Sequence, residues 1–281
     1  MKTILITGAT GVLAKRFISK FALDFRIISG VRNPTHPNSV KVDSWTKIQS
    51  QAKIDAIVHF AGKYLVDDSP ASTQLVHNAT VGTATALANF CKENRTPLLA
   101  LGSYFELAPL NMQPWSHYAS AKQEAAEILE EVSTNHGIAM RYIYAYDTYG
   151  RNLSRKKIVD LLLDPKTEIL ELSPGNQKLN LTHEDDFVEG VKLALKELDS
   201  EIGAFEKLQI RNKSDEFTLR EIAETVNSFR SKKIDLKFGS KPYRSKEVFE
   251  VWDCAPSIQG WSPKTKFQDF VRKNIGGNYE Q

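Results

Sequence analysis

The segment ILITGATGVLA, residues 4–14, decides the predicted fold. Its first four residues are an apolar run that predicts a short buried strand, and the residues after the turn carry apolar side chains at helical spacing. Gly8 permits a tight turn, Gly11 lets backbone amides approach a pyrophosphate, and Ala14 lets the helix pack closely on its strand. A plain strand-to-helix turn is the alternative. The favoured reading is a dinucleotide site that includes Gly8, Thr10, Gly11, Val12 and Leu13.

Four further apolar runs resemble the first strand, at residues 25–32, 56–62, 98–101 and 138–144. They alternate with helical patterns, among them residues 75–92 and 118–131. Strands that alternate with helices predict an α/β fold, here a Rossmann-type doubly wound parallel sheet over residues 1–150. The shorter, mixed segments of residues 151–281 predict a smaller α+β lobe that mainly binds substrate, while some cofactor and substrate contacts continue beyond residue 150.

The composition is that of an ordinary globular protein. The chain has 281 residues, of which 41% are hydrophobic and 25% charged, enough for one or two domains with a sizeable core. The net charge is +3 and the basic residues are scattered along the chain, so the sequence does not indicate a basic surface for nucleic acid or an anionic membrane. Cys91 and Cys254 show no paired spacing, and we predict neither a disulfide nor a metal site. Without an apolar leader or a bilayer-length segment, the sequence predicts a cytoplasmic protein.

The ends of the strands supply candidates for cofactor contacts. In folds of this kind the end of the second strand meets the adenosine ribose, where this sequence offers Arg32. An arginine there can pair with a 2'-phosphate and favours NADP over NAD, although an exposed surface arginine is the alternative. Asp43 is a candidate for the adenine edge. Phe60, Ala61 and Gly62 close a strand with mostly small residues, so the backbone can pass under a flat cofactor. The preceding His59 is flanked by apolar residues, and we predict a core histidine there.

The segment YASAK, residues 118–122, places a phenol and an ammonium one helical turn apart. A fixed cation favours the phenolate and brings proton transfer closer to neutral pH, although this spacing also occurs by chance on exposed helices. Ser103 follows the strand at residues 98–101, where a hydroxyl can bond a substrate oxygen. We therefore predict that Ser103, Tyr118 and Lys122 act together, and that the loop beginning at Tyr104 contacts the substrate.

Together these residues resemble the extended short-chain dehydrogenase/reductase family of the NAD-dependent epimerase/dehydratase type, over nearly the whole chain. No single motif carries the resemblance. The segments that resemble family motifs are Thr7–Ala14, Val58–Gly62, Asn78–Thr83, Tyr118–Lys122, Arg141 with Tyr149–Gly150, His183–Asp186 and Gly260–Pro263. In the third of these, the family pattern Asn-x-x-Gly-Thr is stretched by one residue.

The resemblance implies the roles of the site residues. Ser103, Tyr118 and Lys122 would be the catalytic triad, with Tyr118 as acid or base and Ser103 orienting a sugar carbonyl. Lys122 would also bond the nicotinamide ribose, and Asn78 would lie among the cofactor contacts. The substrate would be a nucleotide-diphosphate sugar, for which Arg244 is the candidate diphosphate ligand, with a plain surface arginine as the alternative.

Departures from the family pattern indicate which reaction to expect. Dehydratases of the family carry Asp-Glu directly after the catalytic hydroxyl, whereas here Ser103 is followed by Tyr104-Phe105 and Glu106 is displaced. The short spacing from Ser103 to Tyr118, together with Arg32, favours a net reduction. The chain is most similar to nucleotide-sugar 4-ketoreductases of the CDP-paratose and CDP-abequose synthase type, which implies a part in deoxysugar and O-antigen biosynthesis. Tyr144 stands where the family has Asn, which puts the usual contacts of that loop in doubt.

Two alternatives stay open at this point. One is a nucleotide-sugar epimerase that keeps NAD tightly bound and returns the hydride to the same sugar. The other is a non-catalytic NAD(P)-binding regulatory protein, against which the three intact positions Ser103, Tyr118 and Lys122 argue. The nucleotide base, the sugar, the product stereochemistry and the oligomeric state are not predicted, with a homodimer as one candidate.

Overall fold

The computed structural model describes residues 1–31, 39–43, 47–48, 53–65, 69–107, 116–150, 157–199, 204–244 and 247–275, with backbone alone for 39–43 and 47–48. The contacts within the chain define two compact units. Unit 1 comprises Met1–Ala145, Val188–Gln209 and Cys254–Gln259, and unit 2 comprises Tyr146–Phe187, Ile210–Asp253 and Gly260–Gln281. Two later segments of the chain therefore belong to the first unit. The division at residue 150 stays a prediction.

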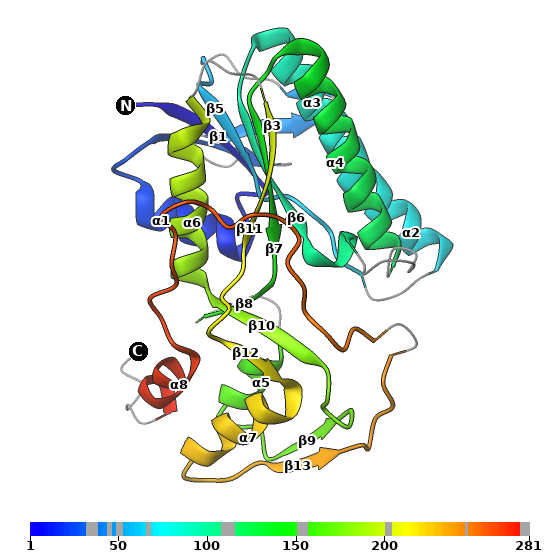
Figure 1. The fold of residues 1–281 in the computed structure, drawn as a ribbon, viewed down its shortest axis with the longest axis vertical. Coiled ribbons are helices and arrows are strands. Elements are labelled where there is room, and N and C mark those ends of the chain that lie inside the picture. The colour runs from blue at the N-terminus through cyan, green and yellow to red at the C-terminus, as the bar shows by residue number, and fades with distance from the viewer. Residues whose placement is uncertain are drawn as a thin grey trace. The chain divides into compact units, whose positions relative to one another are not determined.

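Unit 1 is built on an eight-stranded sheet with the order β11-β7-β6-β5-β1-β2-β3-β4 (Figure 1). Neighbours from β7 across to β3 pair in parallel, and β4 pairs antiparallel with β3. The strand order reverses between β1 and β5, and in such sheets ligands bind at the carboxyl ends of the strands beside that point. The predicted doubly wound sheet is confirmed. Its strands are β1 (Thr3–Thr7), β2 (Arg26–Val31), β3 (Ser39–Asp43), β4 (Lys47–Ile48), β5 (Ala56–His59), β6 (Leu98–Ser103), β7 (Met140–Ala145) and β11 (Phe205–Ile210).

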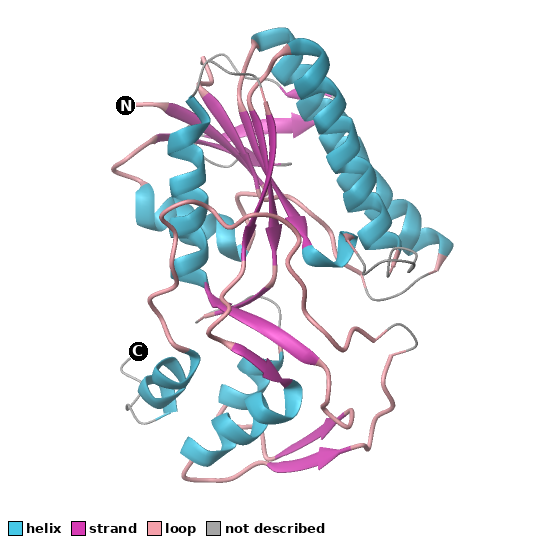
Figure 2. Ribbon diagram, viewed as in Figure 1, coloured by secondary structure: helices cyan, strands magenta, loops and turns pink. Residues whose placement is uncertain are grey.

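Helices cover both faces of this sheet, with α3 and α4 on one face and α1 and α6 on the other (Figure 2). The helix α1 buries Ala14, Phe17 and Phe21, which lie three or four positions apart and form one apolar face against the strands. A core cluster of the unit lies around β5, β6 and β7 and the helices α3 and α4. The helices are α1 (Val12–Phe21), α2 (Pro70–His77), α3 (Thr83–Asn94), α4 (His117–His136) and α6 (Glu184–Lys196), with short 3-10 turns η2 (Tyr104–Glu106) and η3 (Glu197–Asp199).

A π-helical turn, η1 (Asn78–Gly82), joins α2 directly to α3. An extra residue inside a helix widens one turn from an i→i+4 to an i→i+5 pattern without ending the helix. This turn coincides with the segment that resembles the family pattern Asn-x-x-Gly-Thr with one residue more. The stretched motif therefore lies within one continuous helical segment.

Local signals fix the start and end of α4, which carries the Tyr118 and Lys122 pair. The Ser116 side chain accepts a hydrogen bond of 3.2 Å from the Ala119 nitrogen and caps the helix. Gly137 ends it in the left-handed conformation, with φ of 61°. The first turn of α4 therefore places Tyr118 beside the cap, and Lys122 lies one turn further along the same face.

Unit 2 is smaller and contains a three-stranded sheet of order β12-β10-β8 and a parallel pair, β13 with β9. Tyr149 lies in its core, with its ring centroid 5.0 Å from that of Phe270. Asp186 accepts hydrogen bonds from Lys264 and Thr265 with its side chain, and its carbonyl accepts one of 2.8 Å from Trp261. The elements are β8 (Asp147–Tyr149), α5 (Ile158–Leu163), β9 (Ile169–Leu172), β10 (Lys178–His183), β12 (Glu216–Thr218), α7 (Leu219–Phe229), β13 (Asp235–Phe238) and α8 (Phe267–Ile275). In neither unit does a described helix combine the length and apolar character that crossing a membrane requires.

Candidate functional site

The turn after β1 is built so that only glycine fits at its first position. Gly8 has a φ of +70°, and a Cβ there would lie 2.6 Å from the Ala61 nitrogen. The Gly11 nitrogen donates a 2.8 Å hydrogen bond to the Gly8 oxygen and closes the turn. Gly11 is also the N-cap of α1 and supplies no side-chain cap, so the first amides of the helix are open to an anion. The turn therefore fits a dinucleotide pyrophosphate, with Thr10 and Gly11 exposed and Val12 and Leu13 partly buried.

The end of β5 packs directly against this turn. The Phe60 nitrogen donates a 3.1 Å hydrogen bond to the Thr7 oxygen, and Ala61 meets Gly8 as described above. His59 is buried, with Nδ1 2.6 Å from the Thr7 hydroxyl oxygen. Burial, with a smaller effect from the Lys122 charge, lowers the pKa of His59 to about 3. His59 is therefore a neutral core side chain that bonds inside the sheet.

Lys122 reaches from α4 to the carboxyl end of β6. Its ammonium is buried and donates a 2.5 Å hydrogen bond to the Leu101 oxygen. A Cβ built on Gly62 would lie 3.7 Å from the same Nζ, so Lys122 and the end of β5 are neighbours. Burial lowers the pKa of Lys122, and the carboxylate of Glu106 opposes that effect. Tyr118 is partly buried, and its ring meets that of Tyr64 edge to face at 5.1 Å.

Ser103 ends β6 and caps the short turn η2. Its Oγ accepts a 3.4 Å hydrogen bond from the Phe105 nitrogen, and its own nitrogen donates one of 2.5 Å to Oε1 of Glu106. The buried Glu106 also lies 3.0 and 3.1 Å from the Tyr142 hydroxyl through its two oxygens. Sequence reasoning missed Glu106 and Tyr142 as parts of this site. The spacing Ser-x-x-Glu is a capping-box signature and could have indicated the Ser103 and Glu106 contact.

The structure thus brings together the first turn, the ends of β5 and β6, and Lys122. Other predicted residues are placed differently. Arg32 lies outside the described residues, and Asp43 is described only as the last backbone position of β3. Asn78 is exposed and accepts a 2.7 Å hydrogen bond from Gln74. Tyr104 is buried and stacks on Phe105 with ring centroids 4.2 Å apart, so most of its ring surface is already covered. The roles predicted for these residues stay predictions.

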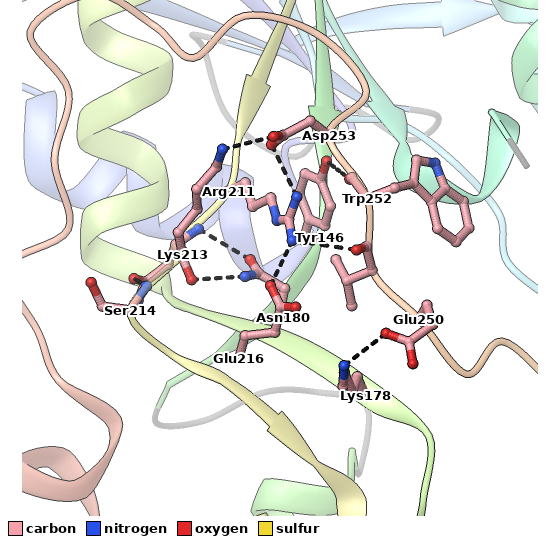
Figure 3. A network of polar contacts seen from close by, with 12 residues as sticks. Tyr146, Lys178, Asn180, Arg211, Lys213, Ser214, Glu216, Glu250, Trp252 and Asp253 are labelled. Atoms are coloured by element: carbon pink, nitrogen blue, oxygen red, sulfur yellow. Dashed lines mark hydrogen bonds and ion pairs between the residues drawn. The ribbon is translucent and has the colours of Figure 1, made fainter. Parts of the chain in front are cut away.

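In unit 2, the candidate Arg244 is exposed, and its backbone nitrogen donates a 3.3 Å hydrogen bond to Glu247. The chain that follows it, residues 247–253, is fixed at several points (Figure 3). Lys178 pairs with Glu250 at 2.8 Å, and the Tyr146 hydroxyl donates a 2.7 Å bond to the Trp252 oxygen.

Arg211 makes the central ion pairs of the same network (Figure 3). Its guanidinium lies 2.7 Å from Glu216 and 3.0 Å from Asp253, and Lys213 reaches Asp253 from the surface at 2.7 Å. This network holds the segment after Arg244 in unit 2. Among the described residues, no group of three or more His, Cys, Asp or Glu side chains is arranged to hold a metal ion.

Comparisons with known proteins show the family and the fold of the chain. Residues 4–205 match the family model described as "NAD dependent epimerase/dehydratase family". A protein of Yersinia pseudotuberculosis named CDP-abequose synthase is 28% identical over 230 residues, which cover 79% of this chain and 77% of that protein. A structure of MoeE5 in complex with UDP-glucose and NAD has a TM-score of 0.81, with 16% identity and coverage of 98% of this chain and 97% of the other. UDP-glucuronic acid 4-epimerase from Bacillus cereus, solved with UDP-glucuronic acid and NAD, has a TM-score of 0.79, 16% identity and 98% coverage of both chains. At these identities the solved structures support the fold.

Proposed function

The chain belongs to the NAD dependent epimerase/dehydratase family, and we propose that it is an NAD(P)-dependent reductase of a 4-keto-6-deoxy nucleotide sugar. The observation that carries the proposal is the position of Lys122. Its buried ammonium bonds the Leu101 oxygen, two residues before Ser103, and lies beside Gly62 at the end of β5. A cation, a hydroxyl and the dinucleotide turn therefore lie at one edge of the sheet, with Tyr118 one helical turn from the cation.

Each of these residues has a role in the proposed ketone reduction. When bound, the reduced nicotinamide supplies the hydride. Ser103 already accepts a hydrogen bond from Phe105, so its own O–H is left to donate to the substrate carbonyl and orient it. Tyr118 then gives its phenolic proton to the carbonyl oxygen as the alcohol forms, and the Lys122 ammonium stabilises the phenolate that remains.

The environment of Glu106 supports reduction over dehydration. Elimination of water needs a carboxyl group that can reach the substrate, whereas the carboxylate of Glu106 faces the Ser103 nitrogen and the Tyr142 hydroxyl. The name of the 28% identical relative, CDP-abequose synthase, supports a deoxysugar nucleotide as the substrate class. The diphosphate of that substrate is assigned to Arg244. Among the described residues the Arg244 guanidinium makes no hydrogen bond or ion pair of its own.

The coenzyme preference is a separate part of the proposal. The family description names NAD, and Arg32 after the second strand favours NADP. In that case Arg32→Ala should weaken NADPH binding far more than NADH binding, as measured by nicotinamide fluorescence titration. Equal effects on the two coenzymes would refute a role in binding the 2'-phosphate.

The test of the function is a direct assay. The protein is mixed with NADPH or NADH and a 4-keto-6-deoxy nucleotide sugar, and the loss of reduced nicotinamide absorbance and the stereochemistry of the product are followed. A reductase consumes one coenzyme for each sugar reduced. An epimerase would carry bound NAD through purification and interconvert sugars without net consumption, and a regulatory protein would bind coenzyme and consume none. No loss of absorbance with either coenzyme contradicts the proposal.

A further inference from the structure

Glu106 is a buried carboxyl group that the proposed proton transfer does not use. It lies in η2, directly beyond β6, and its side chain shares a buried space with Tyr142 of β7. That space exists because position 102 is glycine. A Cβ on Gly102 would lie 2.2 Å from the Tyr142 ring and 2.9 Å from Oε1 of Glu106. The backbone therefore leaves room for this pair of polar side chains in the core.

The contacts of this pair reach both elements of the candidate site. Oε1 of Glu106 accepts a 2.5 Å hydrogen bond from the Ser103 nitrogen. The Tyr142 hydroxyl lies 3.0 Å from Oε2 of Glu106 and 3.1 Å from the backbone oxygen of Lys122. The end of β6 and the turn of α4 that carries Lys122 are thus linked through one carboxyl group and one phenol.

Glu106 and Lys122 also interact through their opposite charges. A buried ammonium costs free energy unless a negative charge or hydrogen bonds compensate it. The hydrogen bond of the Lys122 ammonium is to the neutral Leu101 oxygen, and the carboxylate of Glu106 supplies negative charge nearby. Burial raises the pKa of Glu106 to about 7, against the lowering effects of Lys122 and Lys207 and of the hydrogen bonds from Ser103 and Tyr142. Tyr144 on β7 also interacts with this charge.

We propose that Glu106 is a positioning residue of the proton-transfer site. Its carboxylate fixes the Ser103 end of β6 against α4 and keeps the Lys122 ammonium charged, one helical turn from Tyr118. The effect of this role on catalysis rests on the proposed function. The charge state of Lys122 itself is a property of the protein and is measured without substrate.

The test follows the Lys122 Cε resonance by NMR in full-length protein made with isotope-labelled lysine, assigned by its loss in Lys122→Met. Glu106→Gln keeps an oxygen for the Ser103 nitrogen and the Tyr142 hydroxyl and removes the charge. We expect the titration midpoint of Lys122 to fall by about one pH unit or more, because the ammonium loses its compensating anion. Glu131→Gln makes the same change at an exposed position of α4 and should leave the midpoint in place. An unchanged midpoint in Glu106→Gln overturns the proposal.

A second measurement needs no variant of Glu106. In the wild-type protein, the Lys122 Cε shift should show a smaller step near pH 7, where Glu106 ionises. If Glu106→Gln does not fold, absence of this step overturns the proposal.

In the enzyme assay, Glu106→Gln should move the alkaline limb of kcat/KM to lower pH, in parallel with the Lys122 midpoint. The titration midpoint of Lys122 can fall in Glu106→Gln even if the wild-type protein reduces no keto sugar. That pair of results supports the role of Glu106 in holding the charge of Lys122 and contradicts the proposed reductase. Failure of this inference and failure of the proposed function therefore give different results.

Discussion

The Lys122 ammonium donates a 2.5 Å hydrogen bond to the backbone oxygen of Leu101, which joins the second turn of α4 to the carboxyl end of β6. Ser103 lies two residues further along that strand, and Tyr118 lies one turn earlier in the helix. Residues separated by about twenty positions in the chain are thereby held at the edge where ligands bind in doubly wound sheets. The arrangement is the physical basis for the proposal that Tyr118 transfers the proton.

Tyr118→Phe removes the phenolic proton and keeps the ring. We expect kcat to fall by at least ~100-fold while the dissociation constant of the coenzyme stays nearly unchanged, because only proton transfer is lost. Steady-state kinetics and coenzyme titration measure the two effects. Tyr64→Phe is the matched control, since it removes a hydroxyl from the ring that packs on Tyr118. A comparable loss of coenzyme affinity in Tyr118→Phe would mean that the role of Tyr118 is wrongly assigned.

Gly8→Ala tests the turn after β1. A Cβ at this position would meet the backbone of Ala61 at 2.6 Å and would also require a left-handed φ. We expect a loss of at least ~2 kcal/mol in the free energy of unfolding and a coenzyme affinity weakened by at least ~10-fold. Gly137 has a similar φ of +61°, but the space around it is open. Gly137→Ala should therefore lower the free energy of unfolding by about 1 kcal/mol and leave coenzyme binding unchanged. Equal behaviour of the two variants would show that the close approach to Ala61 does not matter.

His59 should make the stability of the protein depend on acid pH. The unfolded chain protonates this histidine near its ordinary pKa of 6.5, whereas the folded protein keeps it neutral down to about 3. The stabilisation that comes from keeping His59 neutral is therefore fully present above pH 6.5. As the pH falls from 6.5 towards about 3, the free energy of unfolding decreases by up to about 1.4 kcal/mol per pH unit. In His59→Asn, which retains an amide near Nδ1 for the Thr7 hydroxyl, denaturant unfolding should show a shallower dependence. The same slope in both proteins would contradict a neutral, buried His59.

Arg211 and Lys213 provide a matched pair in unit 2, because each pairs with Asp253. The Arg211 side chain is only 10% exposed and bonds Glu216 as well, while that of Lys213 is 61% exposed. We expect Arg211→Met to lower the free energy of unfolding by about 2 kcal/mol or more, since it leaves carboxylates without their partly buried cation. Lys213→Met should change it by less than about 1 kcal/mol. Urea unfolding measures both, and equal losses would mean that burial does not decide the strength of these pairs.

Much of the fold could be predicted because local signals and core packing agree. The helix pattern predicted over residues 118–131 lies within α4 (His117–His136), whose start is capped by Ser116 and whose end is at Gly137. Gly8 has the positive φ, +70°, that suits the tight turn predicted there. These features depend on residues that are near one another in the sequence.

The remaining features depend on contacts across the chain. Tyr142 meets Glu106 only because β7 pairs with β6 in a register that places Tyr142 opposite Ala100 and Tyr144 opposite Gly102. Residues 207–210 were expected in the second lobe, but β11 joins the edge of the large sheet beside β7. An apolar segment does not indicate which sheet it will join, and a tyrosine in a strand does not indicate its partner in another.

Transfer of labelled hydride tests the central proposal most directly. The protein is supplied with reduced coenzyme that carries deuterium at the transferable position, together with a 4-keto-6-deoxy nucleotide sugar, and the released sugar is analysed by mass spectrometry and NMR. The proposed reductase predicts one deuterium on the former carbonyl carbon of the sugar, with one equivalent of coenzyme oxidised. Release of sugar without deuterium, or turnover with no oxidised coenzyme, would contradict it.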